Sequence, residues 1–318
     1  MPASVDAPAR AAPPRTARRG LVFLTVTGLA WGTTGAVADL IYRTGSLGPM
    51  AVSFWRQLGG LVLLLVAVAL LPGGGRRRSA PRPRSRVLLL GGAGLGMAVF
   101  QTAYFAAVEA TGVAVATVIA LGSGPILTAL GGRALLGERV GRGGVLAVVG
   151  ALTGLVVLVG GNADDVADPG GAALSLLAAT GYATVTLLGR LTGRDDDGEH
   201  PFTLTVWSFG IGAAVLLPLA WIEGPVPSGG EPLPVIGLLA YLAAFTTALA
   251  YPLYFAGTAR VRATTASVMM LIEPASAALL AVAFLGEPMT AATAAGTLIL
   301  MGSIAALAAV ESRAAATV

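Results

Sequence analysis

The sequence predicts an all-α polytopic membrane protein whose ten transmembrane helices form two inverted five-helix repeats. Three observations lead to this prediction: an apolar composition, ten hydrophobic segments of span length, and residue patterns that recur in the same order in both halves of the chain. Of the 318 residues, 55% are hydrophobic and 11% are charged, whereas a soluble domain carries about 25% charged residues. Lipid is therefore the expected surrounding of most of the chain.

Ten apolar segments are long enough to cross the hydrocarbon core of a bilayer, which takes about 20 residues of helix. Charged or Pro/Gly-rich stretches separate them. Almost none has the polar face that a helix on the surface of a soluble protein turns toward water. The predicted spans are residues 20–41, 48–71, 87–108, 113–136, 142–161, 171–190, 201–222, 233–257, 262–285 and 289–310.

The spans divide the chain into five parts. Residues 1–19, rich in proline and arginine, are predicted to form a disordered cytoplasmic tail, and residues 20–161 and 171–310 the two repeats. Residues 162–170 would link the repeats outside the cell, and residues 311–318 would form a second cytoplasmic tail. A cleaved signal peptide is not expected, because the first apolar segment has full span length.

All 20 basic residues are arginine, and their positions predict the orientation of the chain. Basic residues in short loops favour the cytoplasmic side. With the N-terminus inside, 18 arginines lie in cytoplasmic segments, whereas Arg43 lies outside and Arg56 lies within a span. The prediction is a multi-pass protein of a bacterial cytoplasmic membrane with both termini inside. The run Arg76–Arg78 fits this orientation signal, and binding of anionic lipid is the lesser alternative.

Matching residues recur at a nearly constant offset in the two halves. Tyr104–Ala106 matches Tyr254–Ala256, and Leu136–Glu138 matches Leu285–Glu287. Since each half has five spans, the second copy enters the membrane from the opposite side, a relation that supports alternating access. The further matched pairs are Pro125 with Pro274, Pro49 with Pro201, Trp55 with Trp207, and Trp31 with Tyr182.

Four motifs carry a resemblance to a known family: Trp31-Gly32, Trp55-Arg56, Pro125 followed by Leu136–Glu138, and Glu273-Pro274 followed by Leu285–Pro288. With ten spans, they resemble the EamA family of the drug/metabolite transporter superfamily over about residues 20–310. The resemblance implies a central cavity and a secondary transporter, more commonly an exporter, of a small metabolite such as an amino acid or an amphipathic compound. The pattern is incomplete, because Ser208 stands where the first repeat has Arg56.

Few ionisable or helix-breaking residues lie within the spans, and each is a candidate for the transport site. A charged side chain at mid-membrane costs about 2.5–3.5 kcal/mol on insertion scales. Glu273 lies near mid-depth directly before Pro274, and the segment with Ser123 and Pro125 is the equivalent break expected in the fourth span. Glu273 is a candidate for proton coupling or for binding a substrate amine, with hydrogen-bonded helix packing as the alternative. For the two prolines the alternative is a kink without ligand contact.

Polar and aromatic residues at a helical spacing of three predict faces that line a cavity. Gln101 and Tyr104 share such a face in the third span, and Tyr251 and Tyr254 share one in the eighth. For the aromatic residues, packing or anchoring at the membrane interface is the alternative. The full set of aromatic and amide candidates is Trp31, Gln101, Tyr104, Tyr182, Tyr251 and Tyr254.

Arg56 and several glycines are predicted to have structural roles. Arg56 lies close enough to the external end of its span to reach the interface by snorkelling, so a structural or topological role is favoured over binding of a carboxylate. Glycine pairs spaced by four residues let helices approach closely in lipid. These pairs are Gly28 with Gly32, Gly92 with Gly96, and Gly150 with Gly154.

An enzyme is not predicted. The chain has no cysteine and no lysine, and its one histidine, His200, lies at a loop boundary, so thiol, zinc-helix and Walker motifs are excluded. A membrane-embedded enzyme or a scaffold without transport remains the alternative to a carrier. The expected partners are a small-molecule substrate, protons as a candidate coupling ion, and the lipid bilayer, with no nucleic acid, cofactor or metal. A monomer or homodimer is expected, and the solute would be uncharged, zwitterionic or weakly cationic.

Overall fold

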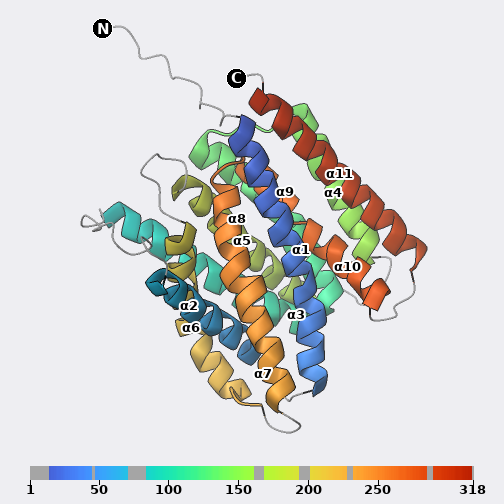
Figure 1. Cartoon of the computed structure of the whole chain (residues 1–318). Helices are drawn as coiled ribbons and strands as arrows, with labels where there is room; N and C mark the ends of the chain where they lie inside the picture. The colour runs from blue at the N-terminus through green and yellow to red at the C-terminus, as the bar shows by residue number, and fades with distance from the viewer. Residues whose placement is uncertain are drawn as a thin grey trace.

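The structure is a computed structural model that describes residues 14–44, 47–70, 84–160, 168–192, 201–227, 232–284 and 289–316. Within these residues all regular secondary structure is helical (Figure 1). The helices in chain order are α1 (Pro14–Thr44), α2 (Pro49–Leu70), α3 (Arg84–Leu136), α4 (Arg142–Gly160), α5 (Pro169–Thr192), α6 (Pro201–Glu223), α7 (Pro232–Tyr241), the π-helix η1 (Leu242–Leu249), α8 (Ala250–Thr258), α9 (Ala263–Met269), α10 (Ile272–Phe284) and α11 (Ala291–Ala316).

In the part of the chain that the structure describes, these helices form nine spans long and apolar enough to cross a membrane, some of them composite, and one shorter apolar helix, α4. α3 contains two spans, Val87–Ala107 and Ala116–Leu136. It turns sharply between them, because the hydroxyls of Tyr104 and Thr117, 13 residues apart, lie 2.7 Å from each other, whereas a straight helix would separate these residues by about 20 Å. α7, η1 and α8 follow end to end as the eighth span, and α9 and α10 form the ninth. Among the described residues, the apolar part of α4 is shorter than that of each of the other spans.

The prediction of ten helices is confirmed, with different boundaries at the two ends of the chain. α1 begins at Pro14 rather than at residue 20, because proline is favourable in the first turn of a helix. α11 continues to Ala316, past the predicted start of the second tail, because its alanine-rich end favours helix. Arg76–Arg78, His200 and Leu285–Pro288 lie outside the described residues.

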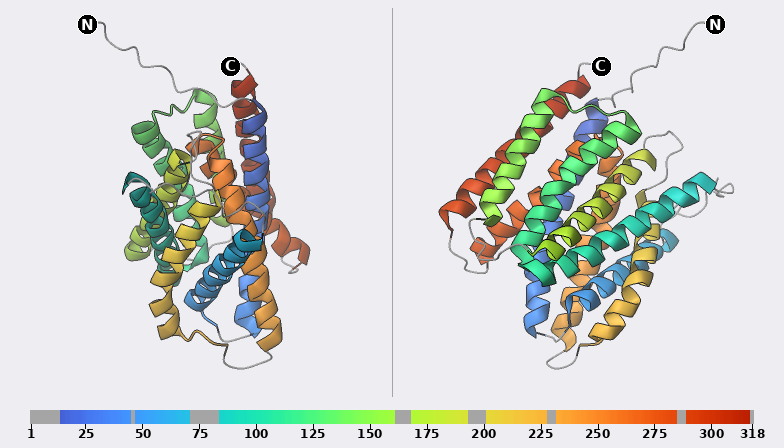
Figure 2. Two further views of the ribbon diagram at one scale, coloured as in Figure 1. Left: turned by 60° about the vertical axis from the view of Figure 1, so that its left-hand side comes forward. Right: turned by 180° about the vertical axis from the view of Figure 1, so that it is seen from behind.

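The two halves exchange their first spans. α1 packs against α8, α9 and α10 of the second half, and α5, the first span of that half, packs against α3 of the first half. Two pairs of equivalent spans also meet directly, α2 with α6 and α4 with α11 (Figure 2). This reciprocal packing is what a two-fold relation between repeats produces. Because each half has an odd number of spans, its copies cross the membrane in opposite directions.

Glycines permit the closest of these approaches, as the sequence predicts. In all three glycine pairs singled out from the sequence, an added Cβ would lie within 3.2 Å of an atom of another helix. The approach is tightest at Gly32, where a Cβ would lie 1.9 Å from Ser276 Oγ on α10. These pairs therefore serve helix packing.

Both ends of the described chain lie at one end of the bundle, where α1 begins and α11 ends (Figure 1). We call this the terminal end. The connection from α3 to α4 lies there as well (Figure 2). An even number of spans places the two chain ends on the same side, so this arrangement agrees with the predicted topology.

Candidate functional site

The ninth span is broken next to Glu273, as predicted. The two-residue turn Met270–Leu271 separates α9 from α10. The Glu273 N–H donates to the carbonyl of Met270, three residues earlier, at 2.9 Å, instead of the fourth residue back that an α-helix uses. Pro274 follows and has no N–H to donate. The break therefore places a carboxyl side chain at the start of α10.

The equivalent break expected in the fourth span is not found. α3 continues through Pro125, which is buried. Neighbouring helices let membrane helices tolerate proline, and here α5 supports the segment, since a Cβ on Gly124 would lie 3.3 Å from the ring of Tyr182. Ser123 precedes this glycine and is partly buried. The repeats thus differ, because glycine stands at the position that Glu273 occupies in the second half.

The predicted aromatic residues come together where the two halves meet. The ring of Trp31 on α1 lies 4.8 Å from that of Tyr251 and 5.4 Å from that of Tyr254, both on α8. The ring of Tyr182 on α5 lies 6.5 Å from that of Tyr254. The first spans of both repeats therefore contribute to one aromatic cluster.

Two phenylalanines that the sequence analysis did not single out complete this cluster. Phe100 joins Tyr104 to Tyr182, with ring centroids 6.1 and 5.6 Å away. Phe209 on α6 packs edge-on against Tyr251 at 4.7 Å. The spacing of Phe100 and Tyr104, four residues on one helical face, is a signal that could have located the first of them.

Two hydrogen bonds join α1 to the eighth span at the π-helix η1 and at the residue that follows it. The indole N–H of Trp31 donates to the carbonyl of Thr246 in η1 at 2.9 Å. One turn earlier on α1, the Thr27 hydroxyl donates to the carbonyl of Ala250 at 3.1 Å. π-Helical segments occur frequently at functional sites, where they alter which backbone groups are available. Residues 233–257 are expected from the sequence to form one regular span, and hydropathy does not distinguish this π-helix from α-helix.

Threonines satisfy two of the tyrosine hydroxyls. Tyr254 Oη lies 2.6 Å from Thr186 Oγ1 on α5, and Tyr104 Oη lies 2.7 Å from Thr117 Oγ1. Thr186 is four residues after Tyr182, so it lies on the same helical face as a residue that was predicted. A buried tyrosine hydroxyl usually has a hydrogen-bond partner, and these bonds also fix the orientation of the two rings.

Arg56 and Glu273 bring opposite charges to this centre. Arg56 Nη2 donates to Gln101 Oε1 at 3.2 Å, so the guanidinium is held toward α3, unlike the predicted snorkelling to the interface. Its Nε is buried and has no hydrogen-bond partner among the described residues. Arg56 is linked to the aromatic cluster through Gln101, because Gln101 Nε2 and Tyr251 Oη both donate to Met97 Sδ, at 3.9 and 3.8 Å. Glu273 lies against α1 beside the cluster, where a Cβ on Gly32, next to Trp31, would lie 3.1 Å from the Glu273 carbonyl oxygen.

A second polar cluster lies at the terminal end. Arg190 Nε on α5 donates to Glu138 Oε1 at 3.2 Å, and the side chains are only 13% and 10% exposed. The other carboxylate oxygen, Oε2, accepts a bond of 2.9 Å from the N–H of Ala263, the first residue of α9. Arg190 also donates to the carbonyl of Ala259. In the sequence Glu138 stands out only as part of the repeated motif Leu136–Glu138, and its partner Arg190 is 52 residues away.

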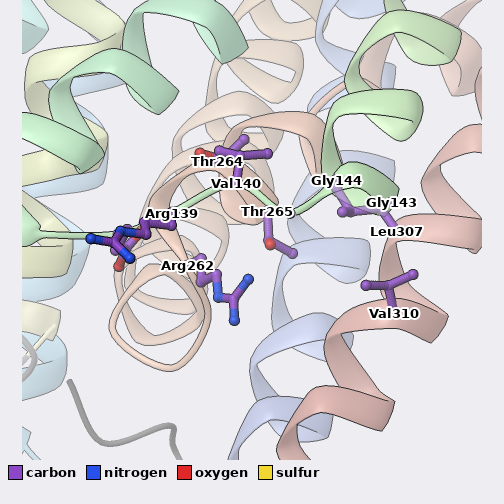
Figure 3. Close-up of a pocket in the computed structure, with 11 residues that line it drawn as sticks. Arg139, Val140, Gly143, Gly144, Arg262, Thr264, Thr265, Leu307 and Val310 are labelled. Carbon is purple, nitrogen blue, oxygen red and sulfur yellow. The ribbon is translucent and has the colours of Figure 1, made fainter. Parts of the chain in front are cut away.

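A small cavity lies beside this cluster, between α4, α9 and α11 (Figure 3). Its volume is about 70 Å³, well below the roughly 300–1,000 Å³ of typical ligand pockets. The cavity is therefore not a candidate for the substrate site. Its lining includes Arg139, Arg262, Thr265, Leu307 and Val310.

The fold and the site define a class of protein. Two interleaved five-span repeats that share a buried polar and aromatic centre, with a broken span beside it, are the architecture of a membrane carrier. A model of the EamA-like transporter family matches residues 18–160 and again residues 169–309. The chain therefore belongs to the EamA-like transporter family, and it is a membrane transporter. This assignment confirms the resemblance seen in the sequence and the expectation that the chain is not an enzyme.

Curated relatives agree with the assignment. The chain is 30% identical over 283 residues to the uncharacterized transporter YwfM of Bacillus subtilis, covering 88% of this chain and 90% of that protein. It is 27% identical over 298 residues to the uncharacterized inner membrane transporter YicL of Salmonella typhimurium, covering 90% and 94%. A solved crystal structure is similar with a TM-score of 0.74 at 20% identity, covering 93% of this chain and 98% of the other. That similarity supports the fold.

Proposed function

We propose that this transporter is a secondary carrier that exports a small metabolite by alternating access, with Glu273 as its coupling carboxylate. The observation that carries the proposal is the position of Glu273, at the break between α9 and α10 and against α1, where a Cβ on Gly32, next to Trp31, would lie 3.1 Å from the Glu273 carbonyl oxygen. Broken spans at the junction of repeats typically form the binding site of a carrier. A carboxyl group inside a span is costly and is therefore a functional candidate.

The charges of the centre favour a zwitterionic substrate. The Glu273 carboxylate would bind an ammonium group, and the unpartnered Nε of Arg56 would bind a carboxylate. The rings of Trp31 and Tyr251, 4.8 Å apart, offer faces for an apolar or cationic group. An amino acid, or another small amphipathic compound, has these features.

Competition at one carboxylate supplies a coupling mechanism. A proton and a substrate amine cannot both occupy Glu273, so proton binding from one side displaces the substrate to the other. An inward proton gradient would then drive export. The turn at Met270–Leu271 and the π-helix η1 are the places where the spans beside the site depart from regular α-helix, and such departures are common hinge positions.

The distribution of arginine supports a cytoplasmic location for the terminal end. The protein would then span a bacterial cytoplasmic membrane with both termini inside, as a monomer or homodimer. The inner-membrane description of the Salmonella relative agrees with this location.

Counterflow in proteoliposomes tests the proposed site without an ion gradient. Vesicles preloaded with unlabelled amino acids should take up a labelled amino-acid mixture faster than protein-free vesicles. Tyr251→Ala, at the centre and 4% exposed, should abolish the uptake, whereas Trp221→Ala, on the outside of α6 and 72% exposed, should not. Equal counterflow by the two variants would contradict a substrate path through the aromatic cluster.

A further inference from the structure

We propose that the ion pair of Glu138 and Arg190 is a latch that holds the carrier closed at its terminal end. The proposal rests on the alternating-access function given above. Glu138 belongs to the first repeat, whereas Arg190 and Ala263 belong to the second, so both side-chain contacts of the carboxylate cross between the repeats. Because α5 packs against α3, opening of the terminal end away from these two helices must break the bonds from Glu138 to Ala263 and from Arg190 to Ala259.

The backbone holds Glu138 in position for this role. Gly137 has φ +65°, the left-handed conformation that commonly ends a helix. The N–H of Glu138 then donates to the carbonyl of Gly132 in the last turns of α3 at 3.0 Å. The carboxylate is thus presented from a fixed helix end rather than from a free loop.

An apolar layer accompanies the ion pair. Leu136 of the first repeat packs with Leu187, Leu191 and Ala263 of the second in a small cluster separate from the main core. This layer and the burial of both charged side chains limit screening by water, which strengthens a charge-assisted hydrogen bond. Opening would break the ion pair but would also hydrate both charges, and this hydration offsets part of the lost electrostatic attraction. The contact is therefore suited to reversible closure.

The latch is joined directly to the broken span that carries Glu273. Ala263, bound by Glu138, is the first residue of α9, and Ala259, bound by Arg190, lies just before it. The Met270–Leu271 turn follows at the other end of this short helix. When the latch opens, α9 is released at its start and can pivot about that turn.

The sequence does not repeat the arginine and glutamate of this pair at the equivalent positions of the two halves. In the alignment of the repeats that pairs Trp31 with Tyr182, Arg190 corresponds to Asp39, and Glu138 corresponds to Glu287. Two acids do not form an ion pair. The latch therefore biases the resting carrier toward closure at the terminal end.

The cysteine-free chain allows a direct test by single-cysteine labelling. Ser267 on α9 is 1% exposed, and its Oγ lies 3.7 Å from the position of a Cβ on Gly124, beside Tyr182. A membrane-impermeant maleimide added to the terminal side should label Ser267→Cys about tenfold faster when Glu138→Gln or Arg190→Gln removes the charge-assisted bond. Arg139→Gln, an exposed neighbour outside the ion pair, is the matched control and should not change the rate.

This labelling needs neither a substrate nor a pH gradient, so its result is independent of whether amino acids are transported. Thermal unfolding of each variant in detergent separates opening from misfolding. If a neutral variant does not fold, Glu138→Asp, which keeps the charge but shortens the side chain, replaces it in the comparison. Labelling of folded variants at the rate of the parent would overturn the latch.

Discussion

Replacement of Gly296 by alanine is expected to weaken the packing of α11 on α4. A Cβ at this position would lie 2.4 Å from the backbone nitrogen of Leu158 and 2.5 Å from its Cα. Backbone atoms cannot rotate away, and non-bonded carbon atoms settle at about 3.5–4.0 Å. The two helices would therefore have to separate locally by about 1 Å.

Gly302 on the same helix is a matched control. A Cβ there has no atom within 4 Å, so alanine should stabilise the protein by about 0.5–1 kcal/mol through its better helix propensity. The same propensity gain applies at Gly296, where overpacking opposes it with a cost of about 1–3 kcal/mol. The difference in unfolding free energy between Gly296→Ala and Gly302→Ala thus isolates the packing cost.

Unfolding of the purified variants in mixed micelles, titrated with a denaturing detergent, measures this difference. Gly296→Ala should unfold at a lower denaturant fraction than the parent, and Gly302→Ala at the same or a higher one. Equal midpoints for the two variants would refute the close approach of α4 and α11.

Three further variants probe the central site. Trp31→Phe removes the donor to the Thr246 carbonyl and should cost about 0.6–2 kcal/mol in the same titration. Thr186→Val should destabilise the protein. Adding Tyr254→Phe to that variant should cost little more, because both substitutions remove the same hydrogen bond. Arg56→Gln should raise the concentration of an unlabelled amino acid needed to inhibit counterflow by about tenfold and leave inhibition by the matching amine unchanged.

The spans could be predicted because hydropathy is summed over a whole segment. The predicted starts at residues 48, 171, 201 and 233 lie within two residues of the observed helix starts at Pro49, Pro169, Pro201 and Pro232, where proline suits the first helical turn. The repeat could also be recognised from the sequence, because its matched residues belong to types that are rare in an apolar chain.

The site was only partly predictable because its contacts depend on tertiary structure. Glu273-Pro274 marks a real break, whereas Pro125 lies in a continuous helix that α5 supports, and a proline alone does not distinguish the two cases. The bond of Arg56 to Gln101 and that of Glu138 to Arg190 join residues far apart in the chain. No local spacing encodes such pairs.

The role of Glu273 is tested most directly by imposing a pH gradient on proteoliposomes and following accumulation of labelled amino acids. Wild type should accumulate label against its gradient, and Glu273→Gln should retain counterflow but lose accumulation. Glu223→Gln, whose carboxylate accepts a bond from Ala51 N–H at the start of α2, is the control and should behave as wild type. Equal gradient-driven accumulation by wild type and Glu273→Gln would contradict coupling through this carboxylate.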